Sequence, residues 1–252
     1  MLAGRVDDRL SRITTCWSKV FEAHQGGQDT VASARRDLLE RYSGAIYRYA
    51  VSSLRDPDAA EEVLQEFAYC FVRGDFRGAN PQQGRFRDLV KTVLFHLIVN
   101  YQRQQRKLSR QQPLPDSFDL PDPNQSAPPE AAERDFLRLW REELLDRVWI
   151  ALEEYERGAG NAFYVALRRH AEKPEMSSEQ LAKMLATETG RALTAGGVRQ
   201  TLHRASEKFA DLLIDEVGRS LEGVERDAIE QELVDLDLLV YCKSALDKRF
   251  SR

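Results

Sequence analysis

The sequence contains little of what marks secreted, metal-binding or membrane-spanning proteins. Only three of its 252 residues are cysteine, and Cys16, Cys70 and Cys242 lie far apart without paired metal-ligand spacing. We interpret them as reduced thiols, because a disulfide framework needs an even, closely spaced set. No window approaches the roughly 18 apolar residues of a membrane-spanning helix, and the first residues lack the apolar core of a signal peptide. We therefore expect a cytoplasmic protein with no membrane partner.

Signatures of catalysis are missing as well. The sequence has no phosphate-binding glycine loop, no His-Glu-x-x-His and no nucleophile elbow, and its four histidines are scattered. We therefore predict that the chain is not an enzyme. We expect no catalytic residue, no metal site and no cofactor.

Strand-like patterns are almost absent. Glycine is sparse, hardly any stretch alternates β-branched with polar residues, and 31% of the residues are charged. These features favour an all-α fold. Because single domains usually hold about 100 to 200 residues, we expect two small helical domains.

Proline is concentrated in one segment. Six of the nine prolines fall between Pro113 and Pro129, where no apolar period persists, so this segment is predicted to be a linker. The expected segments are an N-terminal helical extension (1–34), a first domain (35–110), the linker (111–132), a second domain (133–220) and an acidic C-terminal helical extension (221–252).

Charge is partitioned along the chain. The formal net charge is -4, but residues 73–110 hold 9 Lys or Arg against 2 Asp, a balance of +7. Residues 211–252 hold 11 acidic and 6 basic residues, a balance of -5. Because patches rather than totals steer a protein toward a polyanion, the acidic total does not exclude a nucleic-acid partner.

The stretch GRFRDLVKTVLFHLIVNYQRQQRK, residues 84–107, combines an apolar stripe with a basic face. The opposite face carries Phe95 and Val99 among cations. Either this face is solvated and its apolar residues pack under a neighbouring helix, or its cations bind phosphates around an exposed ring. The stripe residues, at helical steps of three and one, are Phe86, Leu89, Val90, Val93, Leu94, Leu97, Ile98 and Tyr101.

An acidic helix is predicted immediately before this stretch. Asp56 can cap it, with Pro57 at its first position and Asp58 in its first turn. One side of the helix is apolar. The other side is acidic, and either keeps the helix soluble or meets a basic partner.

These two helices resemble a known family. The segments RDPDAAEEVLQEFAYCFV and DFRGANPQQGRFRDLVKTVLFHLIVNYQRQQRK look like region 2 of bacterial sigma factors of the sigma-70 class, extracytoplasmic-function type. The resemblance covers about residues 35–110. It implies that the acidic helix docks on core RNA polymerase through Asp58, Glu61, Glu62, Gln65 and Glu66. It further implies that promoter DNA is opened at the minus-ten element by Arg77, Arg85, Arg87, Lys91, His96, Asn100, Arg103 and Arg106.

A second pair of helices is predicted near the end of the second domain. Ser177 and Gln180 form a capping box, and a further helix begins near Thr194 or Ala195. The pair is either an ordinary helical hairpin or a helix-turn-helix. The segment GGVRQTLHRASEKFADLL resembles the recognition helix of sigma region 4. The resemblance implies that the minus-thirty-five element is read by Arg199, Gln200, His203, Arg204 and Lys208.

The C-terminal extension is predicted to form one or two amphipathic helices. Its apolar residues are Ile229, Leu233, Leu236, Leu239, Val240 and Leu246. One hypothesis is that this acidic segment covers the DNA-reading surface by charge complementarity. The alternative is a plain packing role.

The resemblance implies a promoter-specificity subunit, whose partners are core RNA polymerase and promoter DNA and whose location is the nucleoid. Whether an anti-sigma factor binds it stays open. An autonomous helix-turn-helix regulator, which binds duplex operator DNA without polymerase, is the main alternative. A helical adaptor that binds only protein is another.

Overall fold

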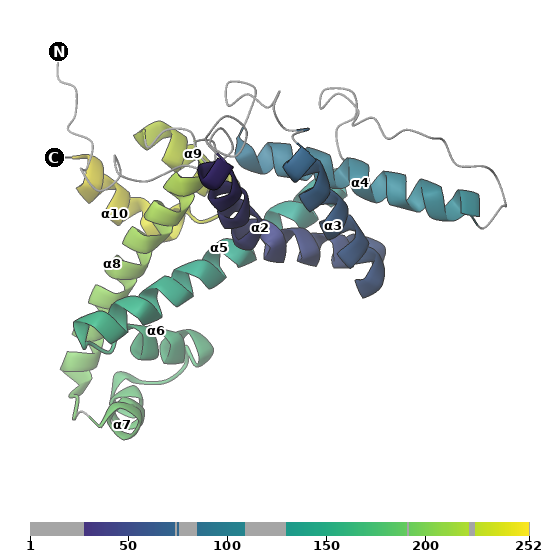
Figure 1. Ribbon diagram of the computed structural model, residues 1–252. Coiled ribbons are helices and arrows are strands. Elements are labelled where there is room, and N and C mark those ends of the chain that lie inside the picture. Colours follow the sequence, from purple (N-terminus) through teal and green to yellow (C-terminus); the bar gives the residue numbers. More distant parts are fainter. Residues whose placement is uncertain are drawn as a thin grey trace, which may run out of the picture. The chain divides into compact units, whose positions relative to one another are not determined.

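The computed structural model describes residues 28–73, 75, 85–108, 130–190, 192–221 and 225–251. These residues are almost entirely helical and include no strand, so the predicted all-α class is confirmed for them (Figure 1). Residues 1–27 of the predicted N-terminal extension and residues 111–129 of the predicted linker lie outside the described residues. The helices are α2 (Gln28–Leu54), α3 (Pro57–Arg73), α4 (Phe86–Leu108), α5 (Glu130–Ala159), α6 (Phe163–Glu172), α7 (Ser178–Thr189), α8 (Ala195–Ser220), α9 (Arg226–Asp235) and α10 (Leu239–Phe250).

The described helices fall into two compact units. The first, called the α2–α4 unit, contains α2, α3, α4 and α5 as far as Glu143. The second, called the α8 unit, contains α5 from Leu144, then α6, α7, α8 as far as Val217, α9 and α10. The division therefore falls inside α5, whereas the proposed domain boundary lies in the proline-rich segment. Residues 133–143 join the first unit because their aromatic side chains pack in its core.

Aromatic rings form the core of the α2–α4 unit. The Trp140 ring stacks on Tyr42 at a centroid distance of 5.0 Å and an interplanar angle of 7°. Phe136 meets the edge of Tyr49 at 5.2 Å. Trp140 and Phe136 are each 1% exposed, so the start of α5 completes this core.

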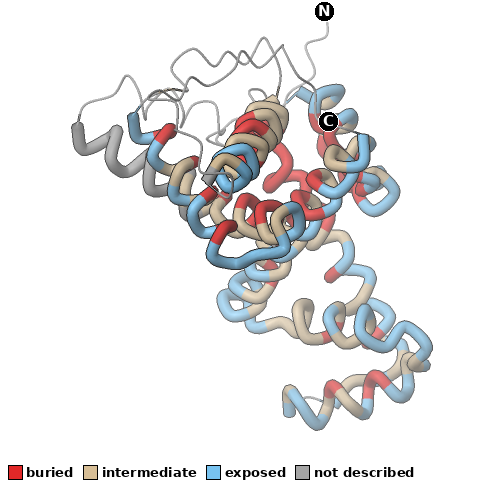
Figure 2. The backbone as a smooth tube through the Cα atoms, turned by 90° about the vertical axis from the view of Figure 1, so that its right-hand side faces the viewer, coloured by how far each residue is buried: buried red, intermediate tan, exposed pale blue. Residues whose placement is uncertain are grey.

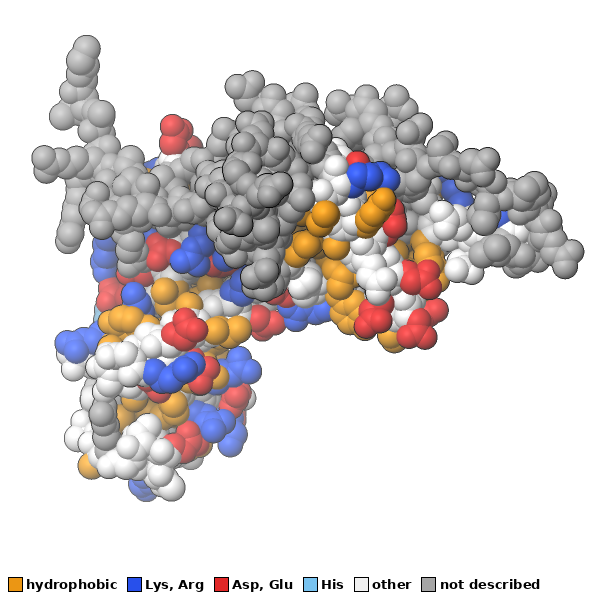
Figure 3. Space-filling model, in the orientation of Figure 1, with side chains coloured by type: hydrophobic (Ala, Val, Ile, Leu, Met, Phe, Trp, Pro, Cys, Tyr) orange, Lys and Arg blue, Asp and Glu red, His pale blue; other side chains and the backbone are white. Residues whose placement is uncertain are grey.

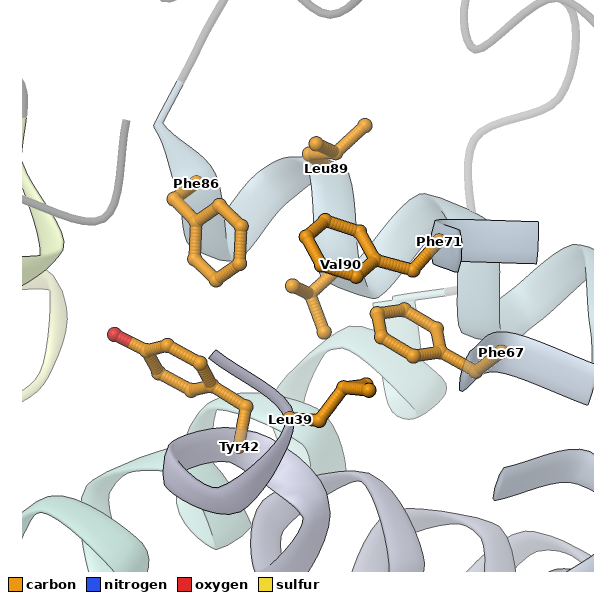
Figure 4. A pocket seen from close by; sticks show the side chains of 7 residues that line it. All are labelled: Leu39, Tyr42, Phe67, Phe71, Phe86, Leu89 and Val90. Carbon is orange, nitrogen blue, oxygen red and sulfur yellow. The ribbon is translucent and has the colours of Figure 1, made fainter. Parts of the chain in front are cut away.

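The predicted apolar stripe of α4 packs into the same unit. Six of its eight residues are buried, while Leu89 and Tyr101 are half-buried. Figure 4 shows apolar side chains of α2, α3 and α4 pointing toward one another around a small apolar pocket. The buried stripe residues are Phe86, Val90, Val93, Leu94, Leu97 and Ile98.

Local capping sets where α3 begins. The Asp56 Oδ1 atom accepts hydrogen bonds from the backbone N–H groups of Asp58 (3.0 Å) and Ala59 (3.4 Å). Pro57 is the first residue of the helix, where its missing N–H costs nothing. The predicted start of α3 is confirmed.

Capping also sets the α7–turn–α8 arrangement of the α8 unit. The predicted capping box is present at α7, because Ser177 and Gln180 each bind the other's backbone N–H. The helix ends at Gly190, whose φ of 68° suits glycine. Thr194 Oγ1 then accepts from the N–H of Gly197 at 3.1 Å and starts α8. Buried Leu185 and Val198 belong to the shared core of α7 and α8.

The C-terminal extension forms a pair of helices, α9 and α10. Figure 2 shows buried positions recurring along the helices between exposed ones. Val240, one of the six apolar residues from which amphipathic helices were predicted, does not lie on the buried side, because 78% of the residue is exposed. Asp237 has a φ of 54°, which ends the α9 period and brings Leu238 inward instead.

Replacing Trp140 tests the aromatic core. Trp140→Ala removes a ring that is 1% exposed, and we expect a loss of about 3 to 5 kcal/mol in the free energy of unfolding. Urea denaturation followed by circular dichroism measures this. Ile150→Ala on the same helix is the control, because Ile150 is 55% exposed. An equal effect of both changes would contradict the packing described.

Candidate nucleic-acid and protein interfaces

The polar face of α3 displays uncommitted carboxylates. Glu61, Glu62 and Gln65 are exposed, and Glu66 is half-buried. Within the described part of the chain, no ion pair joins Glu61 or Glu62 to a cation. Acidic side chains gather around the turn between α2 and α3 (Figure 3). This face can therefore accept a cationic partner surface.

A groove of about 480 Å³ runs between α3 and α4. Each helix contributes residues spaced by three or four, so each presents one row to the groove. Burial, and secondarily the nearby carboxylates of Glu62 and Asp56, raises the pKa of Tyr101. The groove is lined by Glu62, Val63, Gln65, Glu66 and Tyr69 from α3 and by Leu97, Asn100, Tyr101 and Gln104 from α4.

Five of the nine lining residues had not been assigned to a site from the sequence: the apolar Val63 and Leu97, and the aromatic or amide residues Tyr69, Tyr101 and Gln104. Tyr69 follows Gln65 by four residues, and Gln104 follows Asn100 by four. Extending the two helical rows by one turn would have found both. Tyr101 was assigned to the buried stripe, but it is half-buried and reaches the groove. The groove thus joins residues that the resemblance assigned to two different partners.

The assigned minus-ten residues are dispersed in the structure. Arg103 and Arg106 are exposed at the end of α4, and Asn100 lines the groove. Lys91 Nζ lies 2.5 Å from Glu133 Oε1 and 3.4 Å from Asp88 Oδ1, so its charge is already paired. Arg85 lies half-buried just before α4. Arg77 lies outside the described residues.

The structure corrects two of these assignments. Arg87 is 4% exposed and His96 is 7% exposed, so neither side chain is placed to reach a phosphate or a base. Burial, and secondarily Arg103, lowers the pKa of His96, which favours the neutral form. Both residues flank the apolar stripe: Arg87 follows Phe86, and His96 precedes Leu97. A helix margin this close to the stripe is covered once α4 packs.

The first turns of α8 carry an exposed polar row. Arg199, Gln200, His203 and Arg204 are all exposed. Lys208 is half-buried, and its Nζ atom lies 4.2 Å from the centre of the Tyr155 ring. That cation–π contact commits Lys208 to α5. The exposed part of the assigned minus-thirty-five set is therefore its first four members.

The second half of α8 carries carboxylates that α10 neutralises. Arg249 Nη1 lies 2.8 Å from Asp215 Oδ1, and its Nη2 lies 3.2 Å from Asp211 Oδ1. Lys248 pairs with Glu207. These pairs have the opposite polarity to an acidic cover over a basic reading surface. Here the extension supplies the cations and α8 supplies the carboxylates.

Comparisons of the chain with protein-family models, with curated proteins and with solved structures find no match. Among the described residues, no His, Cys, Asp and Glu side chains are grouped so that they could hold a metal ion. None of the described helices combines the length and apolar character needed to cross a bilayer.

Cys70 provides a test of the packing beneath the groove. Burial, and secondarily the Glu66 carboxylate, raises the pKa of its thiol to about 12. The reactive thiolate is therefore scarce at pH 8. We expect Cys70 to resist iodoacetamide in the native protein and to react after unfolding, as followed by peptide mass spectrometry. Rapid labelling of native Cys70 at pH 8 would contradict this environment.

Proposed function

We propose that this protein is a promoter-specificity subunit of bacterial RNA polymerase, of the sigma-70 class. In this role α3 binds core polymerase, the end of α4 holds the opened DNA strand, and α8 contacts upstream duplex. The likeness of two separate segments to sigma regions 2 and 4 supports the proposal. Their order along the chain supports it too.

The observation that carries the proposal is an exposed acidic row on α3 in the same chain as an exposed basic row on α8. Glu61 and Glu62 suit a basic protein surface and would repel DNA phosphates. Arg199 and Arg204 suit DNA phosphates. A regulator that binds only duplex DNA needs the second row and has no use for the first. A protein that bridges an enzyme and a promoter needs both.

The amide and aromatic groups of the α3–α4 groove suit a specific protein contact. Gln65 and Gln104 offer donors and acceptors, and Tyr69 offers a ring that is 57% exposed. Aromatic side chains are enriched at the centres of protein interfaces. We therefore place the polymerase contact at this groove together with the acidic row beside it.

The opened strand is assigned to the last turns of α4. Arg103 and Arg106 are exposed there, among exposed glutamines. Extruding a base costs a few kcal/mol in lost stacking and pairing, which phosphate and base contacts offset. This assignment replaces Arg87 and His96, whose burial removes them from the contact set.

Changing the groove tests polymerase binding. Glu62→Gln combined with Gln65→Ala removes one carboxylate and one amide from exposed positions. We expect the Kd for purified core RNA polymerase to rise about tenfold, because a few central contacts carry most of an interface's energy. Fluorescence anisotropy of the labelled chain measures this.

Glu154→Gln is the matched control, because Glu154 is an exposed carboxylate on α5 outside the groove. It should leave the affinity unchanged. If the wild-type chain fails to bind core polymerase but binds duplex DNA tightly and selectively, the proposal is wrong. The autonomous regulator, which the exposed row on α8 also favours, then stands.

A second test addresses the end of α4. Arg103→Ala with Arg106→Ala should weaken binding to a single-stranded oligonucleotide of about 20 bases. Two lost phosphate contacts make the slope of log affinity against log salt shallower by roughly 1.4. Arg138→Ala with Arg157→Ala, two exposed arginines of α5, is the control and should change the slope little. An unchanged slope in the α4 variant would remove this helix end from the DNA surface.

A further inference from the structure

A single stripe along α8 changes sign from basic to acidic. Residues at steps of four follow one another in a continuous row that winds about 40° around the helix axis with each step. The first members of this stripe are cationic or titratable, and the last three are carboxylates. In order, they are Arg199, His203, Glu207, Asp211 and Asp215.

Helix α10 covers the acidic part of this stripe and leaves the basic part open. The exposed fraction of the side chains falls from 73% at His203 to 42% at Glu207, 38% at Asp211 and 12% at Asp215. Arg249, whose side chain is 3% exposed, binds the last two carboxylates. This buried pair sets the register of α10 on α8. It brings the adjacent Lys248 to Glu207.

Glu207 is the residue at the sign change. Its Oε1 atom pairs with Lys248 and also lies 3.8 Å from His203 Nε2. The Lys248 ammonium is the main cause that lowers the pKa of the Glu207 carboxyl, with His203 and Arg204 contributing less. Glu207 is therefore ionised, and it lies within one turn of two residues proposed to contact DNA.

An ionised carboxylate at this position opposes DNA binding in two ways. It repels phosphates directly. It also competes for Arg204 and for protonated His203, because carboxylates pair with cations three and four residues away on a helix. Lys248 weakens both effects, because it pairs with the same carboxylate from another helix.

We propose that Lys248 of α10 controls the duplex affinity of α8 by neutralising Glu207, so that the C-terminal helix pair promotes DNA binding and does not mask it. The inference rests on the proposed contact between α8 and duplex DNA. It does not depend on polymerase binding. It assigns the C-terminal extension a role in DNA binding, because Lys248 pairs with Glu207 at the edge of the proposed DNA-binding surface.

The test is a cycle of variants in the full chain. Binding to a fluorescent mixed-sequence duplex of about 30 base pairs is measured from about 50 to about 200 mM salt. Lys248→Ala should weaken binding about three- to eightfold near 0.1 M salt, since one uncompensated charge changes the salt slope by about one. Glu207→Gln should bind at least as well as wild type. The double variant should return to within about twofold of wild type, because the carboxylate that needed neutralising is gone.

Lys243→Ala is the matched control. Lys243 is an exposed cation on the same helix, and no carboxylate partner is found for it among the described residues. Lys243→Ala changes the net charge by the same amount as Lys248→Ala does. It should leave duplex binding unchanged, and circular dichroism melting should show that all variants fold as wild type does.

A separate readout tests the contact without DNA. In Lys248→Ala, the pKa of the Glu207 carboxyl should rise toward its ordinary value, as followed by carbon NMR of selectively labelled glutamate. If this pKa rises but wild type binds no duplex, the proposed function of α8 has failed and the inference falls with it. If wild type binds duplex and Lys248→Ala binds equally well or better, the inference alone is overturned. A double variant as weak as Lys248→Ala also overturns it, because Lys248 then acts without Glu207.

Discussion

The ion pairs of Arg249 are the constraint on which the α8 unit depends. A guanidinium that is almost fully buried is stable only when its charge and its N–H groups are satisfied. Asp211 and Asp215, one turn apart on α8, provide for this together. Because both carboxylates belong to the second half of α8, α10 must lie there. The first turns of α8 therefore pack against α7 on one side and face solvent on the other.

The α2–α4 unit follows a similar division of helix faces. Each helix has one apolar stripe, and the aromatic cluster around Trp140 uses the stripes of α2 and α5. Helices α3 and α4 bury their own stripes beside it. The polar rows of α3 and α4 then face each other across a groove. Partner contacts are proposed on those rows because the core leaves them unused.

Local signals predicted the structure well, and long-range contacts limited the prediction. The starts of α3 and α7 depend on residues within three positions, so Asp56 and Ser177 could be assigned from the sequence. The burial of Arg87 and His96 depends on what packs against the margin of α4, which periodicity does not specify. Val240 was misplaced because a positive φ at Asp237 interrupts the period between α9 and α10. The pairing of Lys248 with Glu207 joins residues 41 apart, and no local pattern indicates it.

Formal charge is a poor guide to what this chain can bind, because much of the charge is paired internally. The balance of -5 over residues 211–252 suggests an acidic surface. Yet Asp211 and Asp215 pair with Arg249, Glu216 lies 3.0 Å from Arg147, and Glu232 is fully buried. These four carboxylates therefore repel an approaching polyanion only weakly. Among the described residues, the α8 cations for which no carboxylate of another helix is found stand in the first turns, and a phosphate backbone would meet those. Internal pairing therefore lets an acidic chain present exposed basic residues on one helix.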